Sequence, residues 1–284
     1  MHRLYWETDD LVEASEQIAG VLKKGDVIAI TGAGCSTPSG IGDYRDENGE
    51  WKRRQPVQHK DFVEDHKWRQ RYWARSQVGY PEFLRAEPNR AHQLLAEWEA
   101  RGWIQGIITQ NVDRLHQRAG SQSVIDLHGR LDRIICLACQ STSSRGELQT
   151  YLERVNPQIN DLSKSAVMAP DGDADLVTED YSEYCIPDCE KCGGMLKPDV
   201  VFYGDSVPKP VVERAYDWIS SANAVLVVGS SLMVFSSFRF VRRAAELSIP
   251  IYAINRGKTR GDELFVKKID EDCVSAMQQI NGYL

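Results

Sequence analysis

The stretch VIAITGAGCS, residues 27–36, decides the fold class of this 284-residue chain. Its four leading apolar residues predict a short buried strand, and the sequence Thr-Gly-Ala-Gly after them is typical of a tight turn into a helix. Glycines at such a turn let the backbone approach a pyrophosphate, whose charge faces the N-terminus of the next helix. A tight turn without any ligand is an equally good interpretation of the glycine pair taken alone.

The same stretch departs from the dehydrogenase fingerprint. That fingerprint requires a third glycine at position 37, where this chain has Thr37. It also requires an acidic residue at the end of a second strand about 20 positions on, to hold a ribose. Residues 43–49 are instead a polar run typical of a loop. These departures argue against hydride transfer and leave dinucleotide binding open.

Further apolar runs and helical patterns alternate along the chain. Apolar runs that predict parallel strands lie at residues 106–109, 124–127, 225–228 and 250–254. Helical periodicity is found at residues 10–24, 89–101 and 237–247. Asp10 and Glu13 form a candidate capping pair for the first of these helices. The alternation predicts an α/β fold with a doubly wound, Rossmann-like parallel sheet, which binds ligands at the carboxyl ends of its strands.

Two regions interrupt this alternation and are expected to form a second, smaller lobe. Residues 51–85 are predicted to be mostly helical between Pro56 and Pro81, and residues 131–197 carry two cysteine pairs. The expected division is a Rossmann-like domain at 1–45, 86–130 and 198–284, a helical insertion at 46–85 and a metal-binding module at 131–197. The cleft between the lobes is where we expect the substrate.

Two Cys-x-x-Cys pairs, Cys136 with Cys139 and Cys189 with Cys192, predict a zinc site. Each pair can hold one side of a tetrahedral Zn²⁺ ion as thiolates. Four thiolates close the coordination sphere, so the predicted zinc is structural. Free thiols or redox pairs are the alternative, and Cys185 is a spare candidate ligand.

The candidate catalytic residues follow two of the predicted strands. His128 comes directly after the strand at 124–127, and a histidine with an ordinary pKa of about 6.5 is a natural proton acceptor at neutral pH. Gln110, Asn111 and Asp113 follow the strand at 106–109 and can reach the same crevice. The alternative for these three is a helix cap.

Two other histidines are expected to have structural roles. His92 and His116 lie on predicted helices and are interpreted as hydrogen-bonded residues of the interior.

The composition narrows the class of protein. With 34 basic and 41 acidic residues the net charge is −7, which argues against a nucleic-acid or anionic-membrane binder. The longest apolar run, residues 224–228, is far shorter than the roughly 18 residues of a membrane span. The N-terminal stretch has neither a signal-peptide nor a transit-peptide pattern. Seven cysteines, an odd number, argue against a disulfide scaffold. These features predict a globular protein of the cytoplasm.

Taken together, the motifs resemble the sirtuins, which are NAD-dependent protein-lysine deacylases. The matching stretches are residues 32–36, 40–45, 109–116, 127–129, 197–202, 229–232 and 254–255, with the two cysteine pairs. They occur in family order from residue 29 to the C-terminus. Residues 70–75, 169–173 and 198–205 are similar to class II sirtuins, the group of the mitochondrial lipoamidase-type enzyme and its bacterial relatives. A bacterial cytoplasmic protein is therefore expected, or a mitochondrial matrix protein if an organelle precursor has been trimmed.

The resemblance implies an NAD site over the carboxyl edge of the sheet, with zinc remote from it. The implied cofactor-binding residues are Gly32, Ala33, Gly34, Cys35, Ser36, Asp43, Tyr44, Arg45, Gln110, Asn111, Asp113, Gly229, Ser230, Ser231, Asn255, Arg256, Gly257 and Cys273. Asn111, Asp113 and His128 are the implied catalytic residues. In the implied reaction the acyl oxygen of an acylated lysine attacks the ribose as nicotinamide leaves, and His128 then removes a proton from a ribose hydroxyl. The products are free lysine, nicotinamide and O-acyl-ADP-ribose.

The resemblance also implies how the acyl group is bound. Tyr72, Arg75, Val200 and Phe202 are the implied substrate-binding residues. Sirtuins that remove acidic acyl groups hold the carboxylate with a Tyr-x-x-Arg pair, and residues three apart share one face of a helix. A preference for dicarboxylic acyl groups is therefore predicted. The alternative is that Arg75 pairs with a local acid such as Glu82.

Two other functions are compatible with the same residues. One is protein mono-ADP-ribosyl transfer, which uses the same NAD site with a different acceptor. The other is an NAD-sensing zinc-ribbon interaction module without catalysis, for which His128 would be dispensable. The expected partners are NAD and acylated-lysine proteins or peptides, with no direct nucleic acid and no membrane.

Overall fold

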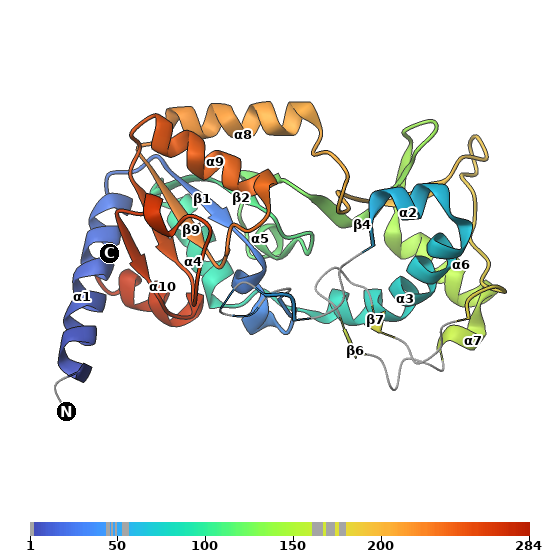
Figure 1. Ribbon diagram of the computed structural model, residues 1–284, viewed down its shortest axis with the longest axis horizontal. Helices are drawn as coiled ribbons and strands as arrows, with labels where there is room; N and C mark the ends of the chain where they lie inside the picture. The colour runs from blue at the N-terminus through green and yellow to red at the C-terminus, as the bar shows by residue number, and fades with distance from the viewer. Residues whose placement is uncertain are drawn as a thin grey trace.

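A six-stranded parallel sheet forms the centre of the larger of two lobes (Figure 1). The computed structural model describes residues 3–43, 46, 48, 50–52, 57–160, 167–168, 174–175 and 180–284. The strand order is β11-β10-β9-β1-β2-β3. The strands are β1 (Val27–Thr31), β2 (Ile104–Thr109), β3 (Val124–Asp126), β9 (Ala224–Val228), β10 (Ile251–Ile254) and β11 (Lys267–Ile269). The predicted doubly wound α/β fold is confirmed.

The order of the strands creates a switch point beside β1. From β1 the chain continues to β2 and β3 on one side, whereas β9, β10 and β11 lie on the other side. The carboxyl ends of β1 and β9 are therefore adjacent, with Thr31 opposite Val228. Ligands of open α/β sheets bind at such a point.

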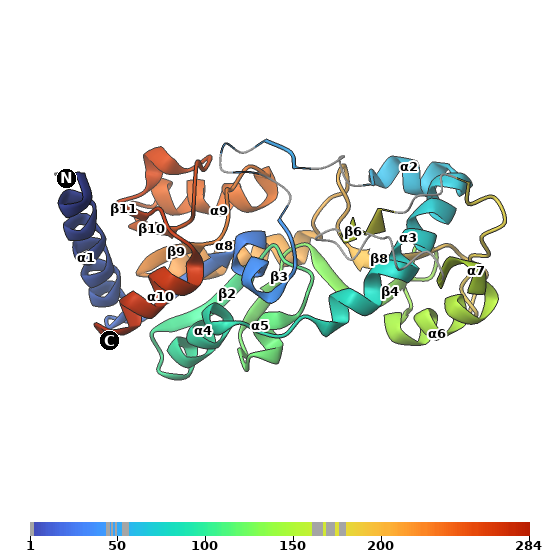
Figure 2. The same ribbon diagram turned by 90° about the horizontal axis from the view of Figure 1, so that it is seen from below.

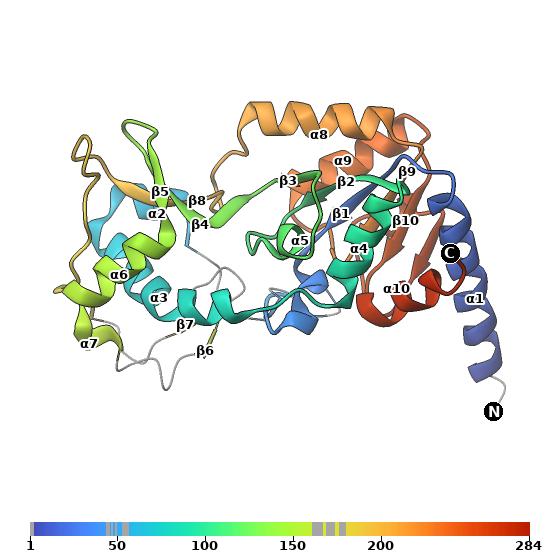
Figure 3. The same ribbon diagram turned by 180° about the vertical axis from the view of Figure 1, so that it is seen from behind.

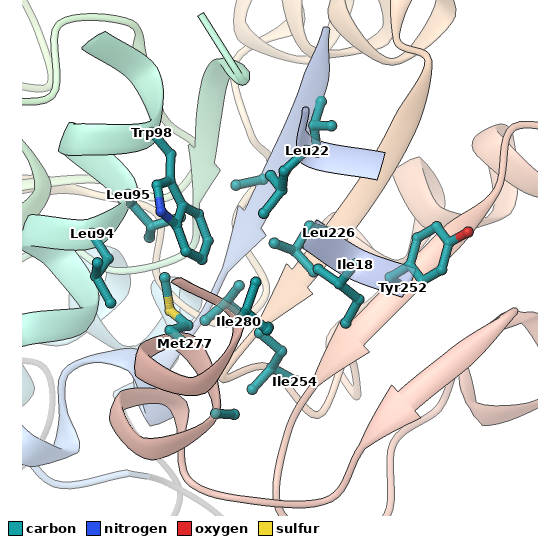
Figure 4. Packing of buried hydrophobic residues seen from close by; sticks show 14 of the residues in the cluster. Ile18, Leu22, Leu94, Leu95, Trp98, Leu226, Tyr252, Ile254, Met277 and Ile280 are labelled. Carbon is teal, nitrogen blue, oxygen red and sulfur yellow. The ribbon is translucent and has the colours of Figure 1, made fainter. Parts of the chain in front are cut away.

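Alternate residues of β1 build two separate cores. Val27 and Ala29 face a core that contains helices α1 (Arg3–Leu22), α4 (Arg90–Ala100) and α10 (Cys273–Asn281). Figure 4 shows this packing, with side chains from those helices gathered against strand residues. The labelled helix residues there are Ile18, Leu22, Leu94, Leu95, Trp98, Met277 and Ile280.

The opposite face of the sheet is covered by two other helices. Ile28 and Ile30 point into the core formed with α8 (Lys209–Ser221) and α9 (Phe235–Glu246). Both faces of the sheet are thus buried, which is why its strands appear in the sequence as continuous apolar runs. β11, with sequence Lys-Lys-Ile, lacks such a run and was not predicted.

The first helix begins earlier than predicted. α1 starts at Arg3, so Asp10 lies inside the helix and the expected capping pair with Glu13 is wrong. Asp10 instead forms an ion pair with Lys267 of β11. Within the described ranges, no helix combines the length and apolar character that crossing a membrane requires.

The smaller lobe consists of helices around a short antiparallel sheet (Figures 2 and 3). Its main helices are α2 (His59–Glu64), α3 (His66–Arg85), α6 (Arg145–Val155) and α7 (Pro157–Asn160). The sheet has the order β5-β4-β8, with β4 (Gly129–Cys136), β5 (Thr142–Ser144) and β8 (Leu196–Val200). A two-stranded pair, β6 (Val167–Met168) and β7 (Ala174–Asp175), lies nearby.

Pro81 does not bound a helix, contrary to the prediction. It lies inside α3, which continues to Arg85. A proline in a helix interior removes a hydrogen bond and strains the preceding turn. Here the flanking Tyr80 and Phe83 are buried in the cluster that joins the lobes, and their burial favours continuing the helix.

The four paired cysteines meet at one end of the small lobe. Cys136 Sγ lies 3.5 Å from Cys192 Sγ, and Cys139 Sγ lies 3.8 Å from Cys189 Sγ. All four sulfur atoms lie within 4.8 Å of one another. A tetrahedron with Zn–S bonds of about 2.3 Å has sulfur atoms roughly 3.8 Å apart, so the cluster fits a structural zinc ion. The spare candidate, Cys185, is not in this group; its thiol faces the Glu183 carbonyl.

Two strands connect the lobes at the predicted domain boundaries. β4 and β8 pair with each other and cross the proposed limits at residues 130/131 and 197/198. The three-part division of the chain remains our proposal, with these strands shared between its parts.

Gly129 provides a test of the packing between β4 and β8. Its φ is +81°, and a Cβ atom there would lie 2.1 Å from the Asp199 carbonyl oxygen. Because the neighbouring group is backbone, we expect Gly129→Ala to lower the free energy of unfolding by roughly 2–4 kcal/mol, measured by urea denaturation. Gly20→Ala in α1, where a Cβ meets nothing within 4 Å, should raise it by about 0.5–1 kcal/mol. Equal effects of the two substitutions would contradict this packing.

Elemental analysis of the purified protein tests the zinc site. We expect one zinc per chain in the wild type and a loss of most of it in Cys136→Ser, because a three-thiolate site is incomplete. Cys185→Ser should retain the full zinc content. Zinc lost in the Cys185 variant, or kept in the Cys136 variant, would show that the ligand set is wrong.

Candidate functional site

Two glycine-containing loops approach each other at the carboxyl ends of β1 and β9. Gly34 N donates a hydrogen bond to Gly229 O at 2.9 Å, and Gly32 N donates to Val228 O at 3.2 Å. Gly229 has a φ of +60°, and a Cβ atom on it would lie 2.3 Å from Cys35 N. Only glycine permits this backbone contact, which leaves a polar groove above the loops.

The groove is a cavity of about 390 Å³ that the implied cofactor-binding residues line. Those that line it are Ala33, Gly34, Asp43, Gln110, Gly229, Ser230, Ser231, Asn255, Arg256 and Cys273. Gly32, Cys35 and Gly257 are not among the lining residues in the described part of the chain. Gly32 packs against Ser230, and Cys35 is fully buried behind the loop. Tyr44 and Arg45 lie outside the described residues.

Two lysines of this cavity, Lys52 and Lys258, had no motif to mark them. Lys52 lines it and forms an ion pair of 2.6 Å with Asp43. Lys258 lines the cavity together with Arg256, which the resemblance had implied. Acidic residues line the same cavity: Arg256 pairs with Glu271, and Asp46 and Asp272 also lie in its wall. A pyrophosphate would therefore compete with carboxylates for these cations.

A second cavity of about 580 Å³ adjoins the first. The two share Ala33, Gln110, Tyr203 and Val234 in their walls. The second is lined by the remaining predicted residues of the reaction centre and acyl site, with the exception of Arg75. They are Ser36, Tyr72, Asn111, Asp113, His128, Val200 and Phe202.

A hydrogen-bonded network holds the polar floor of the second cavity. Ser36 Oγ donates to Asp113 Oδ2 at 2.6 Å, and Asn111 Nδ2 donates to Ser36 Oγ at 3.0 Å and to Gly32 O at 2.9 Å. Burial raises the pKa of Asp113, while the bonds from Ser36 and Leu115 N oppose that rise. Leu115 N begins the short helix α5 (Leu115–Arg118), so Asp113 also caps a helix. The two readings of this residue are compatible.

His128 has its imidazole fixed at both nitrogens. Its Nδ1 lies 3.1 Å from Gln110 O, which can only accept, so Nδ1 carries the hydrogen. Nε2 lies 2.7 Å from Ser236 Oγ and accepts its hydroxyl hydrogen in the neutral ring. Burial lowers the pKa of His128 to about 4. The positive charge of Arg239 also lowers this pKa, whereas the hydrogen bond to Gln110 O raises it. The ring is therefore neutral at pH 7 and carries a basic lone pair at Nε2.

The other two buried histidines form part of the interior, as expected. His116 Nε2 lies 2.8 Å from Thr31 Oγ1, and His92 Nδ1 accepts from Asn89 N at 3.3 Å in a capping box. With Cys35 they form a group whose ligand atoms lie within 4.8 Å. His92 Nδ1 is engaged in the cap and burial raises the pKa of the Cys35 thiol, whereas His116 Nδ1 has no hydrogen-bond partner among the described residues.

The acyl end of the second cavity comes from the small lobe. The Tyr72 ring is 2% exposed and packs 5.2 Å from the Phe202 ring. Arg75, one turn further along α3, is half-buried and is not among the described residues that line the cavity. Glu82, the local acid considered for it, forms an ion pair with Arg85. Only the tyrosine of the pair thus reaches the cavity wall.

The chain has close relatives among bacterial proteins. A protein of Xanthomonas campestris pv. campestris is 54% identical over 251 residues, 88% of this chain and 85% of the relative, and is named NAD-dependent protein deacetylase. NAD-dependent protein deacetylase 2 of Bradyrhizobium diazoefficiens is 53% identical over 251 residues, 88% of this chain and 91% of the relative.

Solved structures show the same architecture. A Sir2 protein in complex with a p53 peptide and NAD⁺ is 28% identical, with a TM-score of 0.73 over 94% of this chain and 96% of the other. Sir2Tm bound to a propionylated peptide has a TM-score of 0.74 and 28% identity over 94% of this chain and 98% of the other. The model of the Sir2 family matches residues 32–236. The chain therefore belongs to the Sir2 family.

Proposed function

We propose that this protein is an NAD-dependent protein-lysine deacylase that transfers the acyl group from lysine to ADP-ribose. The observation that carries the proposal is the position of His128, a neutral base in the second cavity, beside the residues shared with the first. The relatives named NAD-dependent protein deacetylase support it, because they share half of their sequence with this chain.

The first cavity would hold NAD. The cations Lys52, Arg256 and Lys258 line it and would bind the pyrophosphate in competition with Asp43 and Glu271. NAD supplies the activated ribose that accepts the acyl oxygen as nicotinamide departs. Asp43, one of the cofactor-binding residues that the resemblance implies, lines the same cavity.

The second cavity would hold the acylated lysine and the reacting ribose hydroxyl. His128 accepts the proton of that hydroxyl at Nε2, because Nδ1 is already protonated and held by Gln110 O. Asn111 and Asp113 line the same space and would orient the ribose and a water molecule. Apolar walls from Val200 and Phe202 limit the access of bulk water, which would otherwise capture the activated sugar.

We further propose that dicarboxylic acyl groups are preferred over acetyl. Tyr72 lines the acyl end of the cavity, and Arg75 lies three residues along the same helix. The Arg75 guanidinium and the Tyr72 hydroxyl would together bind the acyl carboxylate.

The proposed partners are acylated-lysine proteins and NAD, and the proposed location is the cytoplasm of a bacterium. The relatives are bacterial, and related structures hold p53 peptides. The net charge of −7 also disfavours direct binding to nucleic acid.

Nicotinamide release tests the function. Wild-type protein with NAD and acetyl-, lipoyl-, succinyl- or methylglutaryl-lysine peptides should release nicotinamide and O-acyl-ADP-ribose in equal amounts. His128→Ala should lower O-acyl-ADP-ribose formation by at least roughly 10²-fold, since it removes the general base. Release that does not depend on an acyl-lysine, with label retained on protein, would favour ADP-ribosyl transfer. No release from folded, zinc-loaded protein would favour an NAD-sensing module.

Arg75→Met tests the acyl preference. It should lower the ratio of desuccinylation to deacetylation by about tenfold or more, because a charge-assisted contact to the acyl carboxylate is lost. Arg85→Met at the exposed end of the same helix is the matched control and should leave the ratio unchanged. An unchanged ratio in the Arg75 variant would contradict the proposed preference.

A further inference from the structure

Ser236 contacts the base of the proposed reaction from an element that the sequence did not connect with it. It lies 108 residues from His128 in the chain and 2.7 Å from it in the structure. Ser236 is in the first turn of α9, the helix that packs on the sheet face formed by Ile28 and Ile30. Its position is therefore set by a buried core, and both side chains line the second cavity.

The hydrogen on each atom of this contact follows from its partners. Gln110 O accepts from Nδ1, so the neutral ring has its free lone pair at Nε2. The Ser236 hydroxyl must then donate to Nε2. The imidazole is thus held between a backbone carbonyl on one side and a hydroxyl on the other, and its plane cannot turn without losing one of two hydrogen bonds.

The charged surroundings favour the same protonation state. Arg239, one turn after Ser236 on α9, lines the cavity, and its positive charge disfavours a protonated ring. Ser236 and the N-terminal turn of α9 present the positive end of the helix dipole to the ring. Asp113 from the loop after β2, Asp205 from the loop after β8 and Lys209 from α8 also line this cavity. Asp113 accepts a hydrogen bond from Ser36, and Asp205 is paired with Lys197.

We propose that Ser236 is a positioning residue for the deacylation step, one that holds His128 Nε2 toward the reacting ribose hydroxyl. This inference rests on the proposed function. When the ribose hydroxyl arrives, Ser236 yields the lone pair, the O–H bond of the ribose breaks and its proton goes to Nε2. The ribose oxygen then bonds to the acyl carbon, and the electron pair of the double bond between that carbon and the lysine nitrogen moves to the nitrogen. Nδ1 keeps its hydrogen, which remains hydrogen-bonded to Gln110 O throughout the step.

The order of the two chemical steps provides a specific test. In the proposed reaction His128 acts only after nicotinamide has left, so the exchange of labelled nicotinamide into NAD reports the step before the base is used. Ser236→Ala should leave this acyl-dependent exchange within about twofold of wild type. It should lower O-acyl-ADP-ribose formation by about tenfold, a part of the roughly 10²- to 10⁴-fold contribution of a general base.

Three further variants separate positioning from a structural role. Ser236→Thr keeps the hydroxyl and should restore most of the product formation. Ser237→Ala, next to it, removes a hydroxyl that bonds only the Val234 carbonyl in the described structure and should behave as wild type. Ser236→Ala should have no further effect in a His128→Ala background, since it acts through that ring.

Each other result has a defined meaning. Equal losses of exchange and product in Ser236→Ala would assign a structural role to Ser236 and overturn the proposal, as would full product formation. A wild-type protein that shows neither exchange nor product would instead refute the proposed function itself.

Discussion

The direct contact between the backbones of two loops is the constraint on which the site depends. The loop after β1 and the loop after β9 touch through Gly34 N and Gly229 O, with no side chain between them. This contact is possible because the strands are adjacent and parallel and therefore end at the same edge of the sheet. The contact forms the floor of the first cavity and fixes the positions of the residues that follow each loop.

Gln110 connects this floor to the proposed base. Its backbone N donates to Thr31 O at the end of β1, and its side-chain amide donates to Ser230 Oγ. Its carbonyl oxygen holds Nδ1 of His128. Gln110 thus lines both cavities and also sets the tautomer of the His128 ring. Burial favours the neutral state of His128 by lowering its pKa to about 4, whereas the bond to Gln110 O opposes that lowering and fixes the tautomer.

The parts of this architecture that follow from local patterns could be predicted from the sequence. Strands buried on both faces are continuous apolar runs, so five of the six strands of the large sheet were visible, whereas β11 carries two lysines and was not. The prediction that Pro81 bounds a helix was wrong, because the burial of Tyr80 and Phe83 outweighs the usual cost of a proline inside a helix. The start of α1 was missed for a related reason, since Asp10 pairs with distant Lys267 and does not cap the helix.

The site residues that could be predicted from strand positions are those that follow a predicted strand. His128, Asn111 and Asp113 come directly after strand ends, and all three line the same cavity. Ser236 has no such signal, because a serine in the first turn of a helix is ordinarily interpreted as part of a cap. Its contact with His128 depends on how α9 packs on the sheet, which is a property of the whole fold. Likewise, the spacing of Tyr72 and Arg75 could not show that only one of them reaches the cavity wall.

The second cavity draws its walls from both lobes, and this has a consequence for how such a protein can diversify. His128 and Ser236 belong to the large lobe, whereas Tyr72 and Phe202 are packed with the small-lobe cluster. Substitutions in the small lobe would therefore change the proposed acyl end of the cavity while His128 and Ser236 keep their positions.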